Sequence, residues 1–263
     1  MTLRPLLGAT VALSLAACAM LPQMRHEAAP SDASLAAPLN PIPTTLTGYL
    51  PTADIDGAAL LGPPPSPDSL RGQADRAYYN ETRALAGTPR WNAAIRDNDI
   101  WGGGALKGYA CAAGKEIGPK ATPVLYRLLH RIELDVRTVG KPAKDHYNRP
   151  RPLIGDTQAV CVPREDWMKT NASYPSGHTM VGWAWGLILT ELAPGKADGL
   201  MATAKEVGES RAVCGVHYQS DIEAGRMLAS AMVARLHGDP AFQRDLATAR
   251  RELARSPALS CPV

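Results

Sequence analysis

Two side chains near the carboxyl end of the chain have the types and the spacing of a nucleophile and its orienting partner. His217 and Asp221 are four residues apart in the segment SRAVCGVHYQSD, residues 210–221, and on a helix that spacing brings two side chains together. A carboxylate on one imidazole nitrogen fixes the tautomer and leaves the other nitrogen as a nucleophile or base. Arg211 lies six residues before His217 and could converge on the same anion. The alternative is an ordinary His–Asp pair on a helix surface.

A second cluster, SYPSGHT at residues 173–179, combines a turn with the start of a helix. Pro175 fixes the turn, Ser176 can cap the helix, and Gly177 lets the backbone approach a ligand closely. Free N–H groups at a buried helix start bind anions, so His178 would lie beside a bound anion. The alternative is a plain helix cap with an unrelated histidine.

A third cluster, KDHYNRPRP at residues 144–152, is strongly polar. Such a run is usually a solvated loop, but prolines on both sides of Arg151 stiffen the backbone and aim its guanidinium. Arginine binds phosphate oxygens with two hydrogen bonds, and Lys144 adds a point charge. Neighbours in an extended segment face opposite ways, so Arg149 should point away if Arg151 points toward an anion.

These clusters need a scaffold, and the apolar periodicity from residue 67 onward predicts a helical one. Apolar residues recur at three- and four-residue steps in 68–87 and in 122–136, and Pro123 suits a first helical position. The run HTMVGWAWGLILTEL, residues 178–192, is apolar nearly all round, which predicts a buried central helix. Further helices are expected at 197–213, 221–237 and 239–254. We therefore expect an all-α fold with one compact domain at residues 67–258.

The amino-terminal part indicates export. One positive charge, Arg4, precedes an uncharged stretch too short to span a membrane, so residues 1–17 are expected to form a signal peptide. The sequence Leu-Ala-Ala-Cys18 resembles a bacterial lipobox, which predicts lipid attachment at Cys18. Because Ala19 follows the cysteine, the resemblance also implies a periplasmic protein that is tethered to the outer membrane. The alternative is ordinary cleavage near Ala17. Residues 18–66, rich in Pro and Ala, are expected to form a tether whose last part packs on the domain.

Charge argues against a nucleic-acid partner, and the cysteine content predicts disulfides and not a metal site. Loss of Arg4 leaves 27 of the 28 basic residues against 25 acidic ones, and no basic tract favours a nucleic-acid partner. Cys111, Cys161, Cys214 and Cys261 are an even number in an exported chain, so we expect two disulfides, in one of three possible pairings. No Cys-x-x-Cys pair suggests a zinc site.

Taken in order, the three clusters resemble the signature of the type 2 phosphatidic acid phosphatase superfamily. The flanking segments GTPRWNAAIRDNDI, TPVLYRLL, VPREDW and VCGVHYQSD look like bacterial class A non-specific acid phosphatases, over about residues 67–238. The resemblance implies an all-helical, exported phosphomonoesterase of broad substrate range that uses no metal or other cofactor, and a homodimer or larger homo-oligomer. Leu153 departs from the phenylalanine of many members, a change that should affect packing more than chemistry.

The resemblance also implies a role for each matching residue. His217 would be the nucleophile that forms a phosphohistidine, with Asp221 orienting it, and His178 would be the general acid and then the general base. Phosphate would be held by five residues, namely Lys144, Arg151, Ser176, Gly177 and Arg211. Transfer of the phosphoryl group to an alcohol other than water is an expected side activity.

Three other functions share some or all of these motifs. An integral lipid phosphatase would need several apolar spans of about 20 residues. A vanadium-dependent haloperoxidase would use nearly the same residues to hold vanadate. A lipid-anchored protein that only binds phosphate would not need the catalytic positions, which are all filled here.

Overall fold

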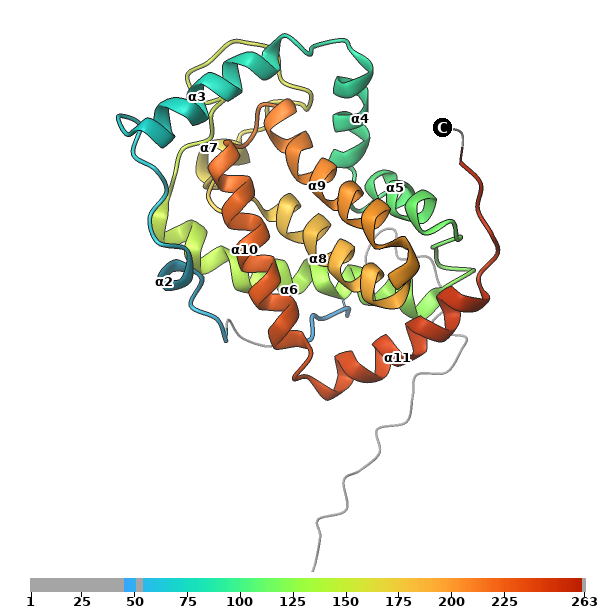
Figure 1. The fold of residues 1–263 in the computed structure, drawn as a ribbon. Helices are drawn as coiled ribbons and strands as arrows, with labels where there is room; N and C mark the ends of the chain where they lie inside the picture. Colours follow the sequence, from blue (N-terminus) through green and yellow to red (C-terminus); the bar gives the residue numbers. More distant parts are fainter. Residues whose placement is uncertain (1–44, 51–53, 262–263) are drawn as a thin grey trace, which may run out of the picture. The chain divides into compact units, whose positions relative to one another are not determined.

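The computed structural model describes residues 45–50 and 54–261, and the expected all-α fold is confirmed (Figure 1). Regular structure in this part of the chain is helical, apart from one isolated bridge between Lys115 and Ala258. The helices, in chain order, are α2 Gly57–Leu61, α3 Leu70–Arg83, α4 Pro89–Asn98, α5 Gly104–Ala113, α6 Pro123–Tyr147, α7 Trp167–Thr170, α8 Gly177–Leu192, the 3-10 turn η1 Pro194–Lys196, α9 Ala197–Val213, α10 Gln219–Leu236 and α11 Pro240–Arg255.

Helix α8 is the buried central helix that the apolar run predicted. It packs against α9, α10, α6 and α5, and Figure 1 shows it between α9, α10 and α6. Met180, Trp185 and Ile188 are fully buried, and the Trp185 indole N–H donates to the Leu129 carbonyl at 2.9 Å. Because α8 packs against four other helices, the residues at its amino terminus are held in place within the domain.

Two glycines on α8 let α9 approach closely. A methyl group on Gly186 would lie 2.5 Å from Ala204 Cβ, and one on Gly182 would lie 2.7 Å from Val207 Cγ1. The short connection through η1 makes the two helices antiparallel neighbours, so the last turn of α9 lies beside the first turn of α8. This packing brings Arg211 close to the motif that contains His178.

Helix α6 is longer than expected and changes the interpretation of the third cluster. Pro123 is at its first position, as predicted, but the helix continues past Pro142 to Tyr147. The apolar face continues through Val139, Gly140 and Ala143, which are all buried, and this packing maintains the helix despite the proline. Lys144 therefore comes from the last helical turn, the left-handed Asn148 (φ 42°) ends the helix, and only residues 149–151 form the irregular segment before the next turn.

The domain also begins earlier than residue 67. Leu46, Tyr49 and Leu50 belong to the main hydrophobic core. The Tyr49 hydroxyl donates to Asp245 Oδ2 at 2.7 Å, and the Leu50 amide donates to Asp135 Oδ1 at 2.8 Å. The last part of the expected tether thus packs on the domain, as predicted, whereas the expected signal peptide at residues 1–17 and Cys18 lie outside the described residues.

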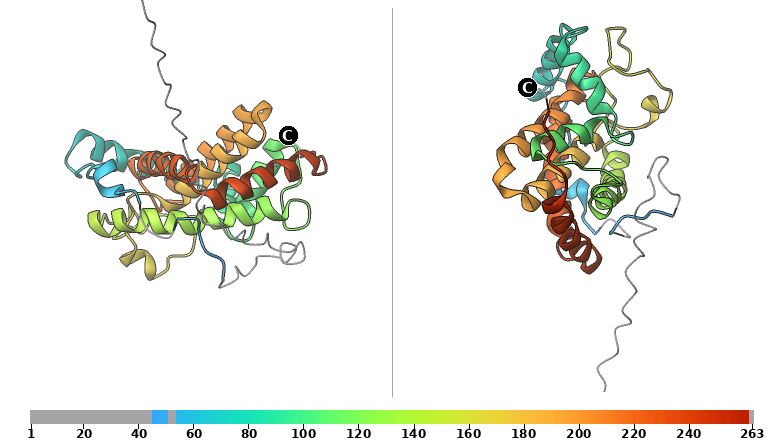
Figure 2. Two further views of the ribbon diagram at one scale, coloured as in Figure 1. Left: turned by 90° about the horizontal axis from the view of Figure 1, so that it is seen from below. Right: turned by 90° about the vertical axis from the view of Figure 1, so that its right-hand side faces the viewer.

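Two disulfides resolve the pairing that the sequence left open. They join Cys111 to Cys261 and Cys161 to Cys214. The second disulfide ties the long loop after α6 to the end of α9, next to a small apolar cluster that includes Trp91, Leu153 and Val216. In the part of the chain described here, no helix combines the length and hydropathy needed to cross a bilayer. Figure 2 shows the long α6 and the loop that carries α7 from two further directions.

Candidate active site

A cavity of about 570 Å³ lies where the carboxyl end of α6, the loop bearing α7 and the amino end of α8 meet. Five of the eight residues that the motifs singled out line it, namely Lys144, Arg151, Gly177, His178 and the expected nucleophile His217. The remaining wall is formed by Ile100, Trp101, Glu133, Val136, Arg137, Gly140, Lys141, Asp145, Asn148, Trp167, Thr170, Asn171, Ala172, Met180 and Val181.

His217 is held with one ring nitrogen toward a carboxylate and the other toward a cation. Its Nδ1 lies 3.4 Å from Asp221 Oδ2 and 3.4 Å from Ser173 Oγ, whereas its Nε2 lies 3.1 Å from Arg151 Nη1. A guanidinium can only donate, so Nε2 accepts and the ring proton is on Nδ1, facing Asp221. The nitrogen with the available lone pair is therefore the one beside Arg151.

The four-residue spacing of His217 and Asp221 acts through a helix cap and not along a helix. Helix α10 begins at Gln219, so His217 precedes it and Asp221 occupies the third helical position. Asp221 Oδ2 accepts from the Tyr218 amide at 2.8 Å and from the Ser173 hydroxyl. At the end of α9, Gly215 has φ +76°, where a side chain would meet Arg83, and this turn directs His217 back toward the cavity.

Arg151 is fixed in the cavity wall by backbone and side-chain acceptors. Its Nε donates to the Asn171 carbonyl at 2.9 Å, its Nη2 to Asn171 Oδ1 at 3.0 Å, and its Nη1 to the Val216 carbonyl at 3.1 Å. Only 5% of the residue is exposed. The guanidinium is thus held in one orientation, as expected from the stiff segment. Hydrogen bonds to Asn171, and not the flanking prolines alone, fix that orientation.

His178 and Arg211 share Asn98, at the end of α4, as a partner. His178 Nε2 lies 3.2 Å from the Asn98 carbonyl, and Arg211 Nη1 donates to Asn98 Oδ1 at 2.7 Å. A carbonyl only accepts, so His178 Nε2 carries a proton and Nδ1 remains available for proton exchange. Arg211 is buried, and its Nε has no hydrogen-bond partner among the described residues.

The remaining motif residues differ in their access to the cavity. The Lys144 ammonium donates to the Ala172 carbonyl at 2.6 Å and lines the wall. Ser176 caps α8, as predicted, and accepts from the Thr179 amide at 3.4 Å and the Thr179 hydroxyl at 2.9 Å. Ser176, Arg211 and Asp221 do not line the cavity in this structure, whereas a methyl group on Gly177 would meet only open space.

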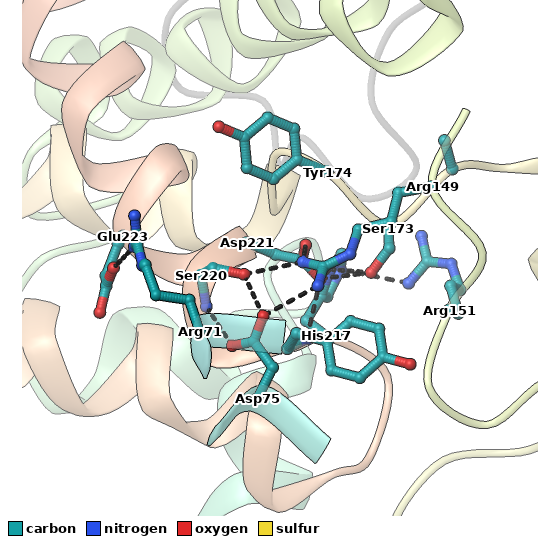
Figure 3. Close-up of polar contacts among 12 residues, drawn as sticks. Arg71, Asp75, Arg149, Arg151, Ser173, Tyr174, His217, Ser220, Asp221 and Glu223 are labelled. Atoms are coloured by element: carbon teal, nitrogen blue, oxygen red, sulfur yellow. Dashed lines mark hydrogen bonds and ion pairs between the residues drawn. The ribbon is translucent and has the colours of Figure 1, made fainter. Parts of the chain in front are cut away.

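A buried polar network supports Asp221 from behind (Figure 3). Arg149 donates to Asp221 Oδ1 at 2.6 Å, to Ser220 Oγ at 2.8 Å and to Asp75 Oδ2 at 2.8 Å. The Ser220 amide donates to Asp75 Oδ1 at 2.9 Å. Arg149 thus points away from the cavity, as the extended segment predicted, and connects α3 to the start of α10.

The cations of the site perturb one another. Burial, and then the charge of Arg151, lower the pKa of Lys144 to about 7. Burial, and then Arg151, lower the pKa of Arg211 to about 9, and burial lowers the pKa of Arg151 to about 10. Burial first, and then neighbouring cations, hold the pKa values of His178 and His217 well below the usual value. A bound dianion would offset this repulsion.

Sequence reasoning did not identify the residues that orient the motif residues. Asn98, Asn171 and Asp75 belong to none of the three motifs, and no periodicity marks them. Ser173 lies within the second motif, but its hydroxyl acts on Asp221 and His217. Thr88-Pro89 is a helix-start signal that could have located α4, and through it Asn98. Among the described residues, no group of three His, Cys, Asp or Glu side chains is arranged to hold a metal ion.

Comparison with known proteins gives consistent matches. A model of the PAP2 superfamily matches residues 135–243. The chain is 40% identical over 200 residues to an acid phosphatase of Zymomonas mobilis subsp. mobilis, covering 75% of each protein. It is 39% identical to a non-specific acid phosphatase of Providencia stuartii, covering 76% of this chain and 82% of that one. It is 35% identical to a non-specific acid phosphatase of Salmonella typhimurium, covering 78% of this chain and 83% of that one.

Proposed function

The chain belongs to the PAP2 superfamily and within it to the acid phosphatases, and on this premise we propose that it hydrolyses phosphomonoesters through a phosphohistidine at His217. The observation that carries the proposal is the orientation of His217. Its Nδ1 faces Asp221 Oδ2 at 3.4 Å, and its Nε2 lies beside Arg151 in the cavity wall. This arrangement leaves a lone pair for phosphorus and a carboxylate to stabilise the imidazolium that forms.

In the first step, the His217 Nε2 lone pair attacks phosphorus and the bond from phosphorus to the ester oxygen breaks. His178 Nδ1 donates a proton to the departing alcohol. Burial first, and then Arg211 and other neighbours, hold the pKa of His178 low; the substrate dianion would offset the part due to the cations, so substrate binding should raise this pKa and favour the protonated acid. An acidic optimum follows, because His217 must stay neutral while His178 is charged.

In the second step, neutral His178 takes a proton from water, the water oxygen attacks phosphorus, and the phosphorus–nitrogen bond breaks to release inorganic phosphate. Lys144, Arg151 and Arg211 would balance the charge on the phosphoryl oxygens in both steps. The Arg211 Nε group is buried without a hydrogen-bond partner in the described part of the chain, and it and the amide groups at the start of α8 would be donors for these oxygens. The side chains thus supply cationic charge, and we propose a reaction without a metal ion. An alcohol in place of water would give phosphotransfer.

The polar roles proposed for Ser176 and Gly177 rest on the first turn of α8. Gly177 lines the cavity and leaves open space for a ligand. The Ser176 hydroxyl accepts from Thr179, so its own proton is available to a phosphoryl oxygen that enters the turn. We expect Ser176→Ala to weaken the helix cap and phosphate binding together.

The test is hydrolysis of p-nitrophenyl phosphate between pH 4 and 9 with EDTA present, for the native protein and His217→Ala. EDTA-resistant turnover with a bell-shaped pH profile, inhibition by vanadate and loss in His217→Ala are the expected results. Substrate labelled at phosphorus should leave acid-labile, alkali-stable label on the protein. His237→Ala, which alters an exposed histidine paired with Glu191, is the control that should stay active.

Other outcomes would select a different function. A folded protein without phosphatase activity that oxidises bromide when loaded with vanadate and given peroxide would be a haloperoxidase. Activity confined to lipid phosphates in vesicles would indicate a lipid phosphatase. Full activity in His217→Ala would reject the phosphohistidine mechanism whichever substrate is used.

We also propose that the protein acts after export, anchored to the outer membrane through lipid at Cys18, as a homodimer or larger assembly. The disulfides Cys111–Cys261 and Cys161–Cys214 support an oxidising compartment. Light scattering after size-exclusion chromatography tests the assembly.

A further inference from the structure

The cavity extends beyond the phosphate-binding cations along one face of α6. Arg137, Lys141 and Lys144 recur at steps of four and three residues on this face, and all three line the cavity. Two helical turns separate Arg137 from Lys144, a distance of about 10.5 Å along the helix axis. Arg137 is therefore too far along the wall to share the phosphoryl oxygens with Lys144 and lies where the alcohol part of a substrate would extend.

Trp101 holds Arg137 in place. The Arg137 guanidinium lies over the Trp101 ring at 5.0 Å from its centroid, and His130 stacks on the same ring at 5.7 Å with 10° between the planes. Arg137 and His130 are seven residues apart on α6, so the spacing of two turns fits an indole ring inserted between them. Tyr126 packs edge-on against His130 at 4.5 Å. This stack restricts an otherwise exposed arginine.

Two donors of this stack, the Arg137 guanidinium and the Trp101 indole N–H, have no acceptor among the described residues, whereas His130 Nδ1 lies 3.1 Å from Glu133 Oε1. The Arg137 guanidinium and the Trp101 indole N–H make no hydrogen bond or ion pair within residues 45–50 and 54–261, although both residues line the cavity. Lys141, by contrast, is paired with Asp145. Glu133 contacts His130 and also acts on Arg137 through space. Burial, as the largest effect, raises the pKa of Glu133 to about 7, whereas His130 and then Arg137 lower it. Protonation of Glu133 at acidic pH therefore leaves the Arg137 charge less compensated.

We propose that Arg137 and Trp101 form a second anion subsite, so that the enzyme favours phosphomonoesters whose leaving group carries a further negative charge, such as a carboxylate or a second phosphate. This inference rests on the proposed phosphatase function and specifies its substrate class. Lys144, Arg151 and Arg211 would bind the phosphoryl group that is transferred. Arg137 would bind the second anion, and the Trp101 indole N–H would donate to one of its oxygens.

The test compares phenyl phosphate with 4-carboxyphenyl phosphate, which differ only in the rigidly held second anion. We expect the ratio of kcat/KM for the carboxylated over the plain ester to fall roughly three- to tenfold in Arg137→Gln, the range of a partly exposed ion pair. The two phenols also differ in reactivity as leaving groups. This difference affects the native protein and Arg137→Gln alike, so it does not change the comparison of their kcat/KM ratios. Added salt should reduce the native ratio, and Trp101→Phe should lower it less than Arg137→Gln.

Arg244→Gln removes an exposed positive charge from α11, away from the cavity, and should leave the ratio unchanged. Equal ratios in the native protein and Arg137→Gln would overturn the second subsite while leaving the phosphatase function intact. Failure of the folded native protein to hydrolyse either ester would reject the proposed function. Binding of phenylphosphonate and 4-carboxyphenylphosphonate would then decide the subsite alone, because an unchanged affinity ratio in Arg137→Gln would overturn it.

Discussion

Burial, together with neighbouring positive charges, determines the pKa values of the cationic side chains in this site. Lys144 shows this most clearly, because its ammonium lines the cavity close to Arg151 and its pKa is lowered to about 7. The three motifs predicted which residue types would meet, because each motif carries its chemistry in a short segment. They could not predict Asn98, Asn171 or Asp75, since an orienting hydrogen bond needs only one acceptor at one place in the fold and leaves no pattern in the sequence.

The lowered pKa of Lys144 predicts how anion affinity depends on pH. A lysine with a lowered pKa is charged below that pKa and loses its charge as pH rises through about 7. An anion that binds the charged form must then bring a proton with it, so its affinity should fall up to about tenfold per pH unit above 7. Competitive inhibition by sulfate, whose own charge is constant between pH 5 and 9, measures this directly.

The variant Lys144→Arg separates the contribution of Lys144 to the pH dependence of sulfate affinity from the contributions of the two histidines. Lys144→Arg keeps its charge to higher pH, so the decline in sulfate affinity should move upward. His178 and His217 have pKa values held well below 6.5 in the free protein. Any proton that sulfate draws to His178 is common to the native protein and Lys144→Arg, so the shift between the two proteins reports Lys144. Lys107→Arg, on the exposed face of α5, is the control. A sulfate affinity that stays flat between pH 6 and 8 would contradict the assignment.

At the level of elements, helix ends carry the motif residues, whereas one face of α6 extends the cavity wall. Apolar periodicity predicted α8, α9 and α11 because their buried faces follow the helical repeat. It did not predict that α6 continues past Pro142, because packing of Val139 and Ala143 outweighs the local cost of a proline. The loop between α6 and α8 could not be derived from periodicity at all, since its position depends on contacts with α9 and on one disulfide.

The two disulfides should differ in their effect on activity. Cys161–Cys214 closes a separation of 53 residues and Cys111–Cys261 one of 150, so chain entropy predicts losses of about 4 and about 5 kcal/mol when each is removed. Only the first joins the loop bearing Arg151 to the segment before His217. We expect Cys161→Ala/Cys214→Ala to lower kcat/KM at least about tenfold through misplacement of these groups.

The matched variant Cys111→Ala/Cys261→Ala should lose stability but keep kcat/KM within about twofold of the native value. Thermal unfolding gives the stability of each double variant, and activity is measured well below both melting temperatures. Equal activity losses in the two variants would show that the Cys161–Cys214 bond acts only on global stability.

For the molecule as a whole, the sequence predicted a single helical domain at residues 67–258, with the last part of the preceding tether packed on it. Leu46, Tyr49 and Leu50 complete the core against α6 and α11, yet they follow a Pro- and Ala-rich stretch that is typical of a linker. The apolar residues in this part of the chain predicted that it packs on the domain, but composition could not predict which side chains are buried or that they contact α6 and α11. The packed segment leaves residues 18–44 as the longest tether that an anchor at Cys18 could use.

The lipid anchor that we propose at Cys18 predicts where in the cell the protein is found. If Cys18 carries two or more acyl chains, each buried CH₂ adds about 0.8 kcal/mol of membrane affinity, which makes release from the membrane negligible. The native protein should then fractionate with outer membranes and require detergent for extraction, whereas Cys18→Ser should appear in the soluble periplasmic fraction with the same kcat/KM per folded molecule. Labelled palmitate should enter only the native protein. A native protein that is soluble and unlabelled would instead indicate ordinary cleavage near Ala17.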